Sequence, residues 1–508
     1  MDASRNPTPP RRSQVFSTMA DGPHRLRVAI VGGGITGACA ASVLARDGHL
    51  DIDVFDQGRR GPGGRASHRA VDGHAAVLPD DDPFDGSPDV LEFDHGCQFF
   101  RADDPRMKAL VREWCASGWA AEWQGRFGSV GEGPATPFFG LPDPAGRPVY
   151  VGASGMHRLP RRILDACEHT TVKRGVRVAS MGPVEDGKWE LLGVSGEAAF
   201  HDSAEAVAAR AASARLAPPY DAVLLTDVSS SFDSWHRASA GVPESMAARV
   251  RERVRVPLFS CMVAFAESLG LPLDGIAFDA PADGGSASAS SAGSSGAGAA
   301  EAATPLWWAS RTQSKPGLEG GGGGAECWTL VSTPAFAVSE ITALPMQDPV
   351  TGAFRPQEDG YLQSGPAPAL LAAFTGAVAH LRPAGATVPR VLYLQGQRWG
   401  SALPAPVGVG GRDRLGHGAG TVRVSHVAYE RSIPPLLFDL AASGGQGAAA
   451  IADQDEPPTP AGELLADDTL HLYYAGDFVS RRAPGFEAAA LSGIDAATHM
   501  ARAMRMRG

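Results

Sequence analysis

Short apolar runs separated by glycine-rich turns dominate the hydrophobic pattern near the N-terminus. Residues 28–31 are an apolar run of the length that a buried parallel strand needs. Apolar residues then take helical spacing over 35–47, Gly48 ends that segment, and 51–55 returns to a strand pattern. This order of strand, helix and strand predicts an α/β domain that begins near residue 25.

The same two periodicities recur along the rest of the chain. Strands are expected at 93–100, 172–181, 189–194, 220–226 and 469–474, and helices at 104–124, at 159–167 and after the stretch 483–487 that opens the last one. The last helix follows a strand, a glycine turn and an acidic residue. The C-terminal part therefore repeats the order of elements seen at the N-terminus.

The turn after the first strand has the G-x-G-x-x-G spacing, at Gly32, Gly34 and Gly37. The first glycine permits the tight turn, the second lets a pyrophosphate approach the backbone, and the third lets helix and strand pack closely. The helix N-terminus offers free N–H groups and a positive dipole end to phosphates. Asp56 follows the second strand, 19 residues after Gly37, where a ribose hydroxyl needs an acceptor. Together these features predict a dinucleotide site.

Two further glycine turns carry polar residues suited to the same ligand. Gly63, Gly64 and Arg65 come shortly after Asp56, and an arginine there can reach a phosphate. Gly476 and Asp477 follow the C-terminal strand. The C-terminal turn and the helix after it form a second cradle suited to a polar cofactor, at the far end of the chain from the first.

Composition narrows the class of protein. The chain has 508 residues, 44% of them hydrophobic, and a net charge of −11 without a basic stripe, so two or three domains are expected and nucleic acid is not an expected partner. Six separated cysteines without a C-x-x-C pair indicate a reducing, intracellular compartment, cytoplasmic or in an organelle such as a plastid. We expect no metal site and no membrane span. Residues 1–24 are either a disordered tail or a short transit segment.

Several of these stretches resemble a known pattern. The glycine turns, Asp56 and the Asp94-His95-Gly96 stretch are similar to flavin-binding elements of the amine oxidase superfamily, and other stretches resemble renalase-like flavoproteins. Those stretches are Ser154-Gly155-Met156, Trp308-Ala309-Ser310-Arg311, Ser314-Lys315-Pro316-Gly317, Gln397-Arg398-Trp399 and 488–497. One departure is Leu318, where these relatives usually have arginine.

The resemblance implies a Rossmann-type FAD-binding domain that is discontinuous, at 25–100, 150–230 and 465–508. An α+β substrate domain with a mixed sheet would comprise 101–149 and 231–464, interrupted by flexible inserts at 281–303, 318–325 and 441–463. Arg65 would approach the pyrophosphate, Val178 would touch the adenine through its backbone, and Asp477 would hold the ribityl–phosphate end. The implied cofactor-binding residues are Gly32, Gly34, Ile35, Thr36, Gly37, Asp56, Gly64, Arg65, Val178, Gly476, Asp477, Phe486 and Glu487, the last two near the isoalloxazine.

The resemblance also implies an activity. Renalase-like proteins are similar to oxidases that move hydride from a dihydronicotinamide-type small substrate to flavin N5 and return the electrons to O2, giving H2O2. The protein supplies orientation and excludes water in such a reaction. Two alternatives stay open: amine or polyene oxidation on the same scaffold, and a flavin-binding protein of low turnover that acts in redox sensing or as an interaction module.

Three residues are candidates for catalysis. Lys315 would contact a substrate phosphate or lie near the flavin, and the alternative is an exposed loop lysine. Trp308 and Trp399 would stack on a nicotinamide or wall the pocket, and the alternative is a place in the core. His95 is expected to be a packed turn residue.

Overall fold

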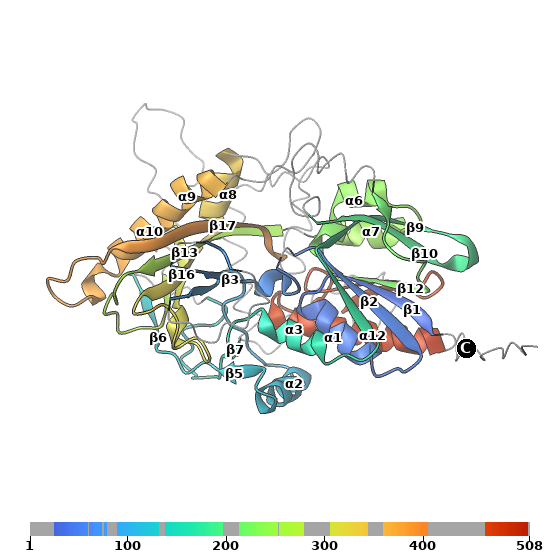
Figure 1. The fold of residues 1–508 in the computed structure, drawn as a ribbon, viewed down its shortest axis with the longest axis horizontal. Coiled ribbons are helices and arrows are strands. Elements are labelled where there is room, and N and C mark those ends of the chain that lie inside the picture. The colour runs from blue at the N-terminus through green and yellow to red at the C-terminus, as the bar shows by residue number, and fades with distance from the viewer. Residues whose placement is uncertain are drawn as a thin grey trace, which may run out of the picture.

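The fold consists of two large sheets lying side by side (Figure 1). It is known from a computed structural model. The structure describes residues 25–58, 60–73, 76–78, 89–131, 138–196, 213–251, 253, 255–278, 305–343, 359–404 and 463–505. In these ranges, no helix combines the length and the apolar character needed to cross a membrane.

The first sheet has the parallel order expected of a dinucleotide-binding fold. Its strands are, in spatial order, β18 (Leu464–Asp467), β19 (Leu472–Ala475), β12 (Ala222–Leu225), β1 (Leu26–Val31), β2 (Leu50–Asp56) and β8 (Thr170–Arg174). All neighbours are parallel except β18 and β19. The glycine turn follows the central strand β1, so it opens at the carboxyl edge of the sheet, where such folds bind ligands.

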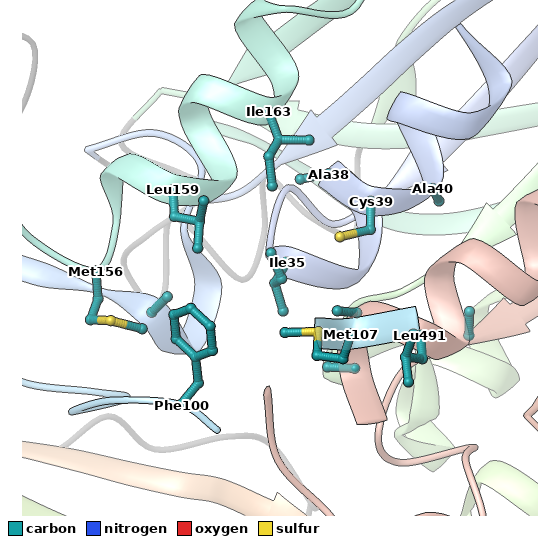
Figure 2. Close-up of a cluster of buried hydrophobic side chains, with 14 of the residues drawn as sticks. Ile35, Ala38, Cys39, Ala40, Phe100, Met107, Met156, Leu159, Ile163 and Leu491 are labelled. Carbon is teal, nitrogen blue, oxygen red and sulfur yellow. The ribbon is translucent and has the colours of Figure 1, made fainter. Parts of the chain in front are cut away.

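Helices and a small sheet cover opposite faces of the first sheet (Figure 1). Val28 and Ile30 join a core with α1 (Ile35–Leu44), α3 (Arg158–Asp165) and α12 (Phe486–Arg505). Figure 2 shows α1 side chains beside Leu159 and Ile163 of α3 and Leu491 of α12. The opposite core includes residues of β9 and β10. The elements on that side are β9 (Val176–Pro183), β10 (Trp189–Ser195), β11 (Ala214–Arg215), α6 (Asp233–Ala238) and α7 (Glu244–Arg251).

The second sheet is mixed, as expected. Its order is β17 (Val391–Pro404), β13 (Arg255–Phe265), β16 (Glu326–Ser332), β15 (Leu306–Arg311), β14 (Gly275–Phe278) and β6 (Phe127–Val130). Only the β14–β6 pair is parallel. Near it lie α8 (Pro334–Ala343), α9 (Asp359–Ser364) and α10 (Pro366–Ala377), which Figure 1 shows along one side.

A hairpin from the N-terminal part of the chain packs on the second sheet. Its strands are β3 (His68–Val71) and β4 (Leu91–Asp94), and Phe93 shares a core with Met262 and Tyr393. The hairpin lies within the segment 25–100 that was expected to belong to the cofactor domain, and it contributes its apolar side chains to the core beside the second sheet.

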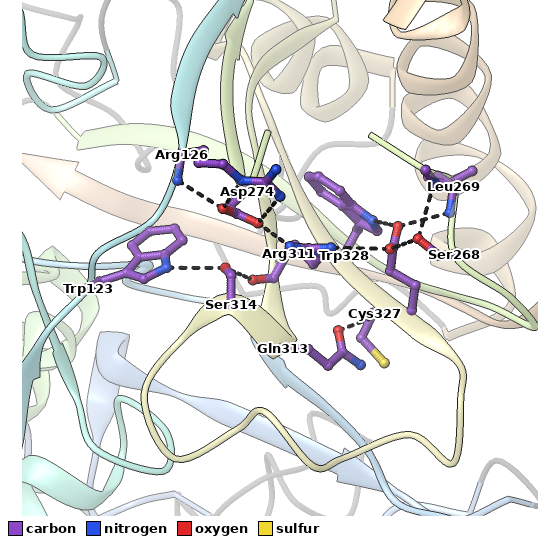
Figure 3. A network of polar contacts seen from close by, with 12 residues as sticks. Trp123, Arg126, Ser268, Leu269, Asp274, Arg311, Gln313, Ser314, Cys327 and Trp328 are labelled. Atoms are coloured by element: carbon purple, nitrogen blue, oxygen red, sulfur yellow. Dashed lines mark hydrogen bonds and ion pairs between the residues drawn. The ribbon is translucent and has the colours of Figure 1, made fainter. Parts of the chain in front are cut away.

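Polar contacts fasten the edge of the second sheet (Figure 3). Asp274 accepts hydrogen bonds from Arg126 and pairs with Arg311, which also reaches Glu326. Ser314 donates to the Arg311 carbonyl at 2.7 Å. The turn after β15 is therefore held at one end by an ion-pair network, which positions the residues that follow.

Several expected elements differ from the observed ones. The helix expected over 104–124 ends earlier, as α2 (Pro105–Ala116), because Gly118 turns the chain with φ +68° before β5 (Ala120–Glu122), which pairs with β7 (Tyr150–Gly152). The strand expected at 172–181 is divided at Gly175, also at positive φ, into β8 and β9.

The three inserts expected to be flexible have different outcomes. The segment 318–325 is a turn in which Leu318 is buried and Ala325 donates to the Gly322 carbonyl at 2.7 Å, so it is a structured loop. The inserts at 281–303 and 441–463 lie outside the described residues, apart from residue 463.

We predict that Gly493→Ala destabilises the fold. A Cβ at this position of α12 would lie 2.2 Å from the Thr36 carbonyl oxygen of α1. The two helices would have to separate, and overpacking of this kind typically costs about 1–3 kcal/mol. Urea unfolding followed by circular dichroism measures the effect.

The matched control is Gly376→Ala in α10, where a Cβ meets nothing within 4 Å. It is expected to leave stability unchanged or raise it by up to about 1 kcal/mol through helix propensity. Equal stability changes in the two variants would contradict the close packing of α12 on α1.

Candidate functional site

The first glycine turn is close-packed except at one position. A Cβ on Gly32 would lie 2.6 Å from the Thr226 hydroxyl, and one on Gly37 would lie 1.9 Å from the Gly32 carbonyl oxygen. Gly34 differs, because the atoms nearest to a Cβ at this position would be 3.9 Å away. Gly34 directly precedes α1, whose first N–H groups are open to a ligand. Ile35 and Thr36 form the first positions of this helix.

Asp56 closes the same turn from the end of β2. Its carboxylate accepts the backbone N–H of Gly33 at 2.9 Å and that of Gly58 at 2.8 Å. Burial raises its pKa, and the two N–H groups counteract the rise. A carboxylate has about four acceptor positions, so two bonds leave capacity for a ribose hydroxyl.

The second glycine turn lies against the first. The Gly63 N–H donates to the Gly33 carbonyl at 3.1 Å, and a Cβ on Gly64 would come within 3.3 Å of the Gly34 Cα. Arg65 therefore leaves this turn directly beside the cradle around Gly34. Its guanidinium also donates to the Ala402 carbonyl at 3.0 Å, at the end of β17.

Arg65 and Asp477 form a bidentate ion pair. The two N···O distances are 2.8 and 2.5 Å, and the Asp477 side chain is buried. The sequence predicted that both residues belong to one site but assigned each a separate ligand contact. In the structure they bind each other across 412 positions of sequence. Gly476, which precedes Asp477, is fixed by a hydrogen bond from its N–H to Ser492 of α12 at 2.8 Å.

Two residues expected at the isoalloxazine have other contacts. Phe486 stacks on Phe100 with ring centroids 4.3 Å apart. The Glu487 carboxylate accepts the N–H groups of Asp103 at 2.7 Å and Asp104 at 3.1 Å, at the start of α2. Glu487 thus binds the start of a neighbouring helix, and its expected place near the isoalloxazine stays a prediction. Val178 is buried in β9.

A buried carboxylate, Asp94, lies where the two sheets meet. One oxygen pairs with the Lys315 ammonium at 3.0 Å. The other accepts from the His68 ring at 3.0 Å and from the Met156 N–H at 2.9 Å. The four groups come from β4, β3, the turn after β15 and the turn before α3. Asp94 therefore binds elements of both sheets at once.

The charges in this cluster compensate each other. Burial favours neutral forms, but Lys315 and His68 hold the pKa of Asp94 well below its usual value. Burial likewise opposes charging of His68, but the Asp94 and Glu92 carboxylates raise its pKa to about 9. Both residues are therefore ionised at neutral pH. An ion pair of this kind is costly to break because a lone buried charge would remain.

The stretches that resemble renalase-like proteins meet at this cluster. The Ser154 N–H donates to the Pro316 carbonyl at 3.1 Å, and a Cβ on Gly317 would lie 2.5 Å from the Ser154 hydroxyl. Ser314 accepts from the Trp123 indole at 3.1 Å. Lys315 is only 1% exposed, so the alternative of an exposed loop lysine is wrong. Its pairing with Asp94 also gives no support to a substrate-phosphate contact.

The two candidate tryptophans occupy different environments. Trp308 is fully buried and stacks on Phe138 at 5.2 Å, which matches the core alternative. Trp399 is half-buried, and its indole N–H is shared between the His95 carbonyl at 3.0 Å and Ser260 at 3.2 Å. Of the two, Trp399 is the one whose position suits a ligand contact.

His95 stacks on Trp399, with ring centroids 5.5 Å apart. It is buried, and neither ring nitrogen has a hydrogen-bond partner within the described ranges. Burial, with Arg69 and Arg60 nearby, lowers its pKa well below the usual value, so the ring is neutral. His95 was expected as a packed turn residue, and the structure adds that it offers two orphan polar atoms.

Three polar residues near Asp94 were not predicted from the sequence. His68 and Glu92 face each other across the β3–β4 hairpin, and Gln98 accepts from Ser310 at 2.6 Å. The available signal was a polar residue inside an otherwise apolar strand, which requires a buried partner.

Comparisons with known proteins support the fold of the first sheet. Residues 30–114 match the model of an NAD(P)-binding Rossmann-like domain. Among solved structures, a reduced UDP-galactopyranose mutase has a TM-score of 0.49 at 10% identity, covering 94% of this chain and 96% of that one. A putrescine oxidase has a TM-score of 0.46 at 12% identity, covering 94% and 99%. A CLA-producing fatty acid isomerase from P. acnes has a TM-score of 0.47 at 10% identity, covering 92% of this chain and 97% of that one. With TM-scores below 0.5, these structures carry no inference about activity.

We predict that Lys315→Met and Asp94→Asn each lower the free energy of unfolding by about 3–5 kcal/mol, because each leaves its former partner charged and buried. The double variant should cost less than the sum of the single changes. Chemical denaturation measures all three. Asp51→Asn, which removes an exposed partner of Arg25, is the control and should cost less than about 1 kcal/mol. Additive single changes would contradict the Asp94–Lys315 interaction.

We also predict a pH dependence of stability that comes from His68. Because the folded-state pKa of about 9 exceeds the unfolded value, its contribution is complete below pH 6.5 and is lost as the pH rises through about 9. Unfolding free energies measured from pH 6 to 10 should fall more steeply for the wild type than for His68→Gln. Parallel curves would show that His68 carries no proton at neutral pH.

Proposed function

We propose that this protein is an FAD-dependent oxidoreductase. The observation that carries the proposal is the cradle at Gly34. It is open at the N-terminus of α1, has Asp56 on one side, and has the Arg65–Asp477 pair on the other. Backbone N–H groups and a helix dipole suit a diphosphate, and a carboxylate suits a ribose. The residues present therefore fit a dinucleotide cofactor.

Bound flavin would supply the redox chemistry, accepting a hydride and returning the electrons to O2 as H2O2. The chain itself would bind and orient. Gly32, Gly34 and Gly37 would take the diphosphate, and Asp56 the adenosine ribose. The orphan nitrogens of His95 would offer hydrogen bonds to polar ring atoms of a ligand. A neutral imidazole fits this role better than a charged one, because it can both donate and accept.

The proposed substrate is a small dihydronicotinamide-type molecule. A hydride transfer of this kind needs orientation and a dry site, with little acid–base assistance. Trp399 offers a half-buried aromatic ring close to the loop that carries Arg65, since a Cβ on Gly96 would lie between the Arg65 carbonyl and the Trp399 ring. An aromatic surface there suits a flat heteroaromatic substrate.

We propose a division of the chain that follows the sheets. The cofactor domain would comprise 25–66, 150–230 and 465–508, and the substrate domain the remainder, with the β3–β4 hairpin included. The boundary crosses the Asp94 cluster, so the two parts would act as one unit.

Anaerobic reduction of bound flavin tests the substrate class. Purified protein is mixed with NADH, NADPH, their 2- and 6-dihydro isomers and a panel of small amines, and the loss of flavin absorbance is followed. Fast bleaching by an isomer, reversed by air with peroxide formed, is the expected result. Bleaching by amines alone would assign the protein to amine oxidation. Flavin that no compound bleaches would favour a binding protein of low turnover.

We predict that Gly34→Val abolishes FAD binding while the fold stays intact. The nearest atoms to a Cβ at Gly34 are 3.9 Å away, so the side chain would fill ligand space instead of protein. Flavin content and fluorescence titration measure binding, and thermal unfolding measures stability. Gly48→Val, at an exposed position with nothing within 4 Å, is the control and should bind normally. A Gly34→Val protein with full flavin would contradict the proposed site.

A further inference from the structure

A small pocket lined by three arginines lies between the two sheets. Its walls come from the chain after β12, the chain after β19, the start of β13 and the end of β17. The charged residues that line it are Arg65, Arg253, Arg255 and Asp477. Three guanidinium groups thus face a single carboxylate, and that carboxylate is already held by Arg65 through both of its oxygens.

Among the described residues of this pocket, Arg253 is the arginine that hydrogen-bonds only to backbone carbonyl groups, at Phe478 and Ser480. It is half-buried and donates to the carbonyl oxygens of Phe478 at 3.0 Å and Ser480 at 3.5 Å. Within the described parts of the chain it makes no ion pair. Carbonyl oxygens satisfy N–H groups but carry no net charge, and burying a cation without a counter-ion is unfavourable. An anion beside Arg253 would remove this cost.

The electrostatic environment agrees with that reading. Burial lowers the pKa of Arg253 to about 10, although Asp477 opposes the change. The group is still protonated at neutral pH, so the protein holds a cation in surroundings that disfavour it. Arg255 lies nearby and donates to the Ser231 carbonyl and hydroxyl, each at 2.9 Å.

The position of the pocket identifies the class of anion. Arg65 belongs both to the pocket and to the glycine turn that lies against Gly34, and Asp477 follows β19 at the carboxyl edge of the first sheet. Arg65 therefore connects the pocket to the turn that packs against the Gly34 cradle. Planar guanidinium groups bind two phosphate oxygens with paired hydrogen bonds. A carboxamide or hydroxyl group of a ligand carries no negative charge, so it would not neutralise these guanidinium groups.

We propose that Arg253, together with Arg65 and Arg255, binds a phosphate group of a dinucleotide. Two sources present the same chemistry: the diphosphate of the cofactor, and a phosphate of a dinucleotide substrate. The choice between cofactor and substrate as the source of the phosphate rests on the proposed function. The proposal that the pocket binds phosphate does not depend on that function. Arg65 would exchange part of its contact with Asp477 for the phosphate, which keeps the carboxylate neutralised.

The test compares Arg253→Gln, which removes the charge, with Arg253→Lys, which keeps it. Fluorescence titration gives the Kd for FAD and for riboflavin, which lacks phosphate. Anaerobic bleaching gives the concentration dependence for a 6-dihydro dinucleotide and for the matching phosphate-free riboside. Arg502→Gln, an exposed arginine of α12, is the control for net charge.

If the cofactor phosphate lies in the pocket, Arg253→Gln raises the Kd for FAD about tenfold to a hundredfold, as expected for a charge-assisted hydrogen bond. Riboflavin binding is unchanged, the salt dependence of FAD binding falls, and Arg253→Lys restores most of the affinity. If the substrate phosphate lies there, Arg253→Gln leaves FAD binding unchanged. The concentration of the 6-dihydro dinucleotide that gives half-maximal bleaching then rises about tenfold to a hundredfold, while that of the phosphate-free riboside does not change.

Two results would overturn the proposal: no change in any of these measurements, or an equal loss of FAD and riboflavin binding, which would indicate a general structural effect. If the wild type binds no flavin, the proposed function fails. Calorimetric titration with ADP and inorganic pyrophosphate then tests separately whether the pocket binds phosphate. Binding by the wild type that weakens in Arg253→Gln supports the pocket, and absence of binding or equal binding rejects it.

Discussion

The pairing of Asp94 with Lys315 inside the protein is the interaction on which the arrangement of the two sheets depends. A buried carboxylate is tolerated only when its charge is matched at close range, so its partners have little freedom to move. Lys315 follows a strand of the second sheet, and the Met156 N–H that binds the same carboxylate precedes α3 of the first. Since α3 packs on α1, this one carboxylate fixes the second sheet relative to the turn at Gly34.

Features that follow from local chemistry could be predicted from sequence. The turn from Gly32 to Gly37 depends on backbone conformation and close approach, which only glycine permits, and the structure has these contacts. The helix after Phe486 could likewise be predicted from the spacing of its apolar residues alone, and the structure has α12 there. The helix expected over 104–124 was too long because its apolar spacing continued past Gly118, although a glycine at positive φ ends a helix.

Features that depend on pairing between distant segments could not be predicted. Nothing near Lys315 in the sequence indicates that Asp94 neutralises it, so burial and exposure were equally compatible with the sequence. Arg65 and Asp477 were each assigned to the cofactor, but their contact with each other depends on how the first and last turns meet. Glu487 was expected near the flavin, and the contact of its carboxylate with the start of α2 was not foreseen.

These pairings show how a chain of net charge −11 would present the proposed anion site. Three carboxylates near the cradle have partners in the protein: Asp56 has two backbone N–H groups, Asp477 has Arg65, and Asp94 has Lys315 and His68. The positive groups nearby are the N-terminus of α1 and the guanidinium of Arg253. Because nearby charges act more strongly than distant ones screened by solvent, the local excess governs binding whatever the overall charge. Because Arg65 lines the arginine pocket and follows the turn that contacts Gly34, the cradle and the pocket would bind parts of one anionic ligand.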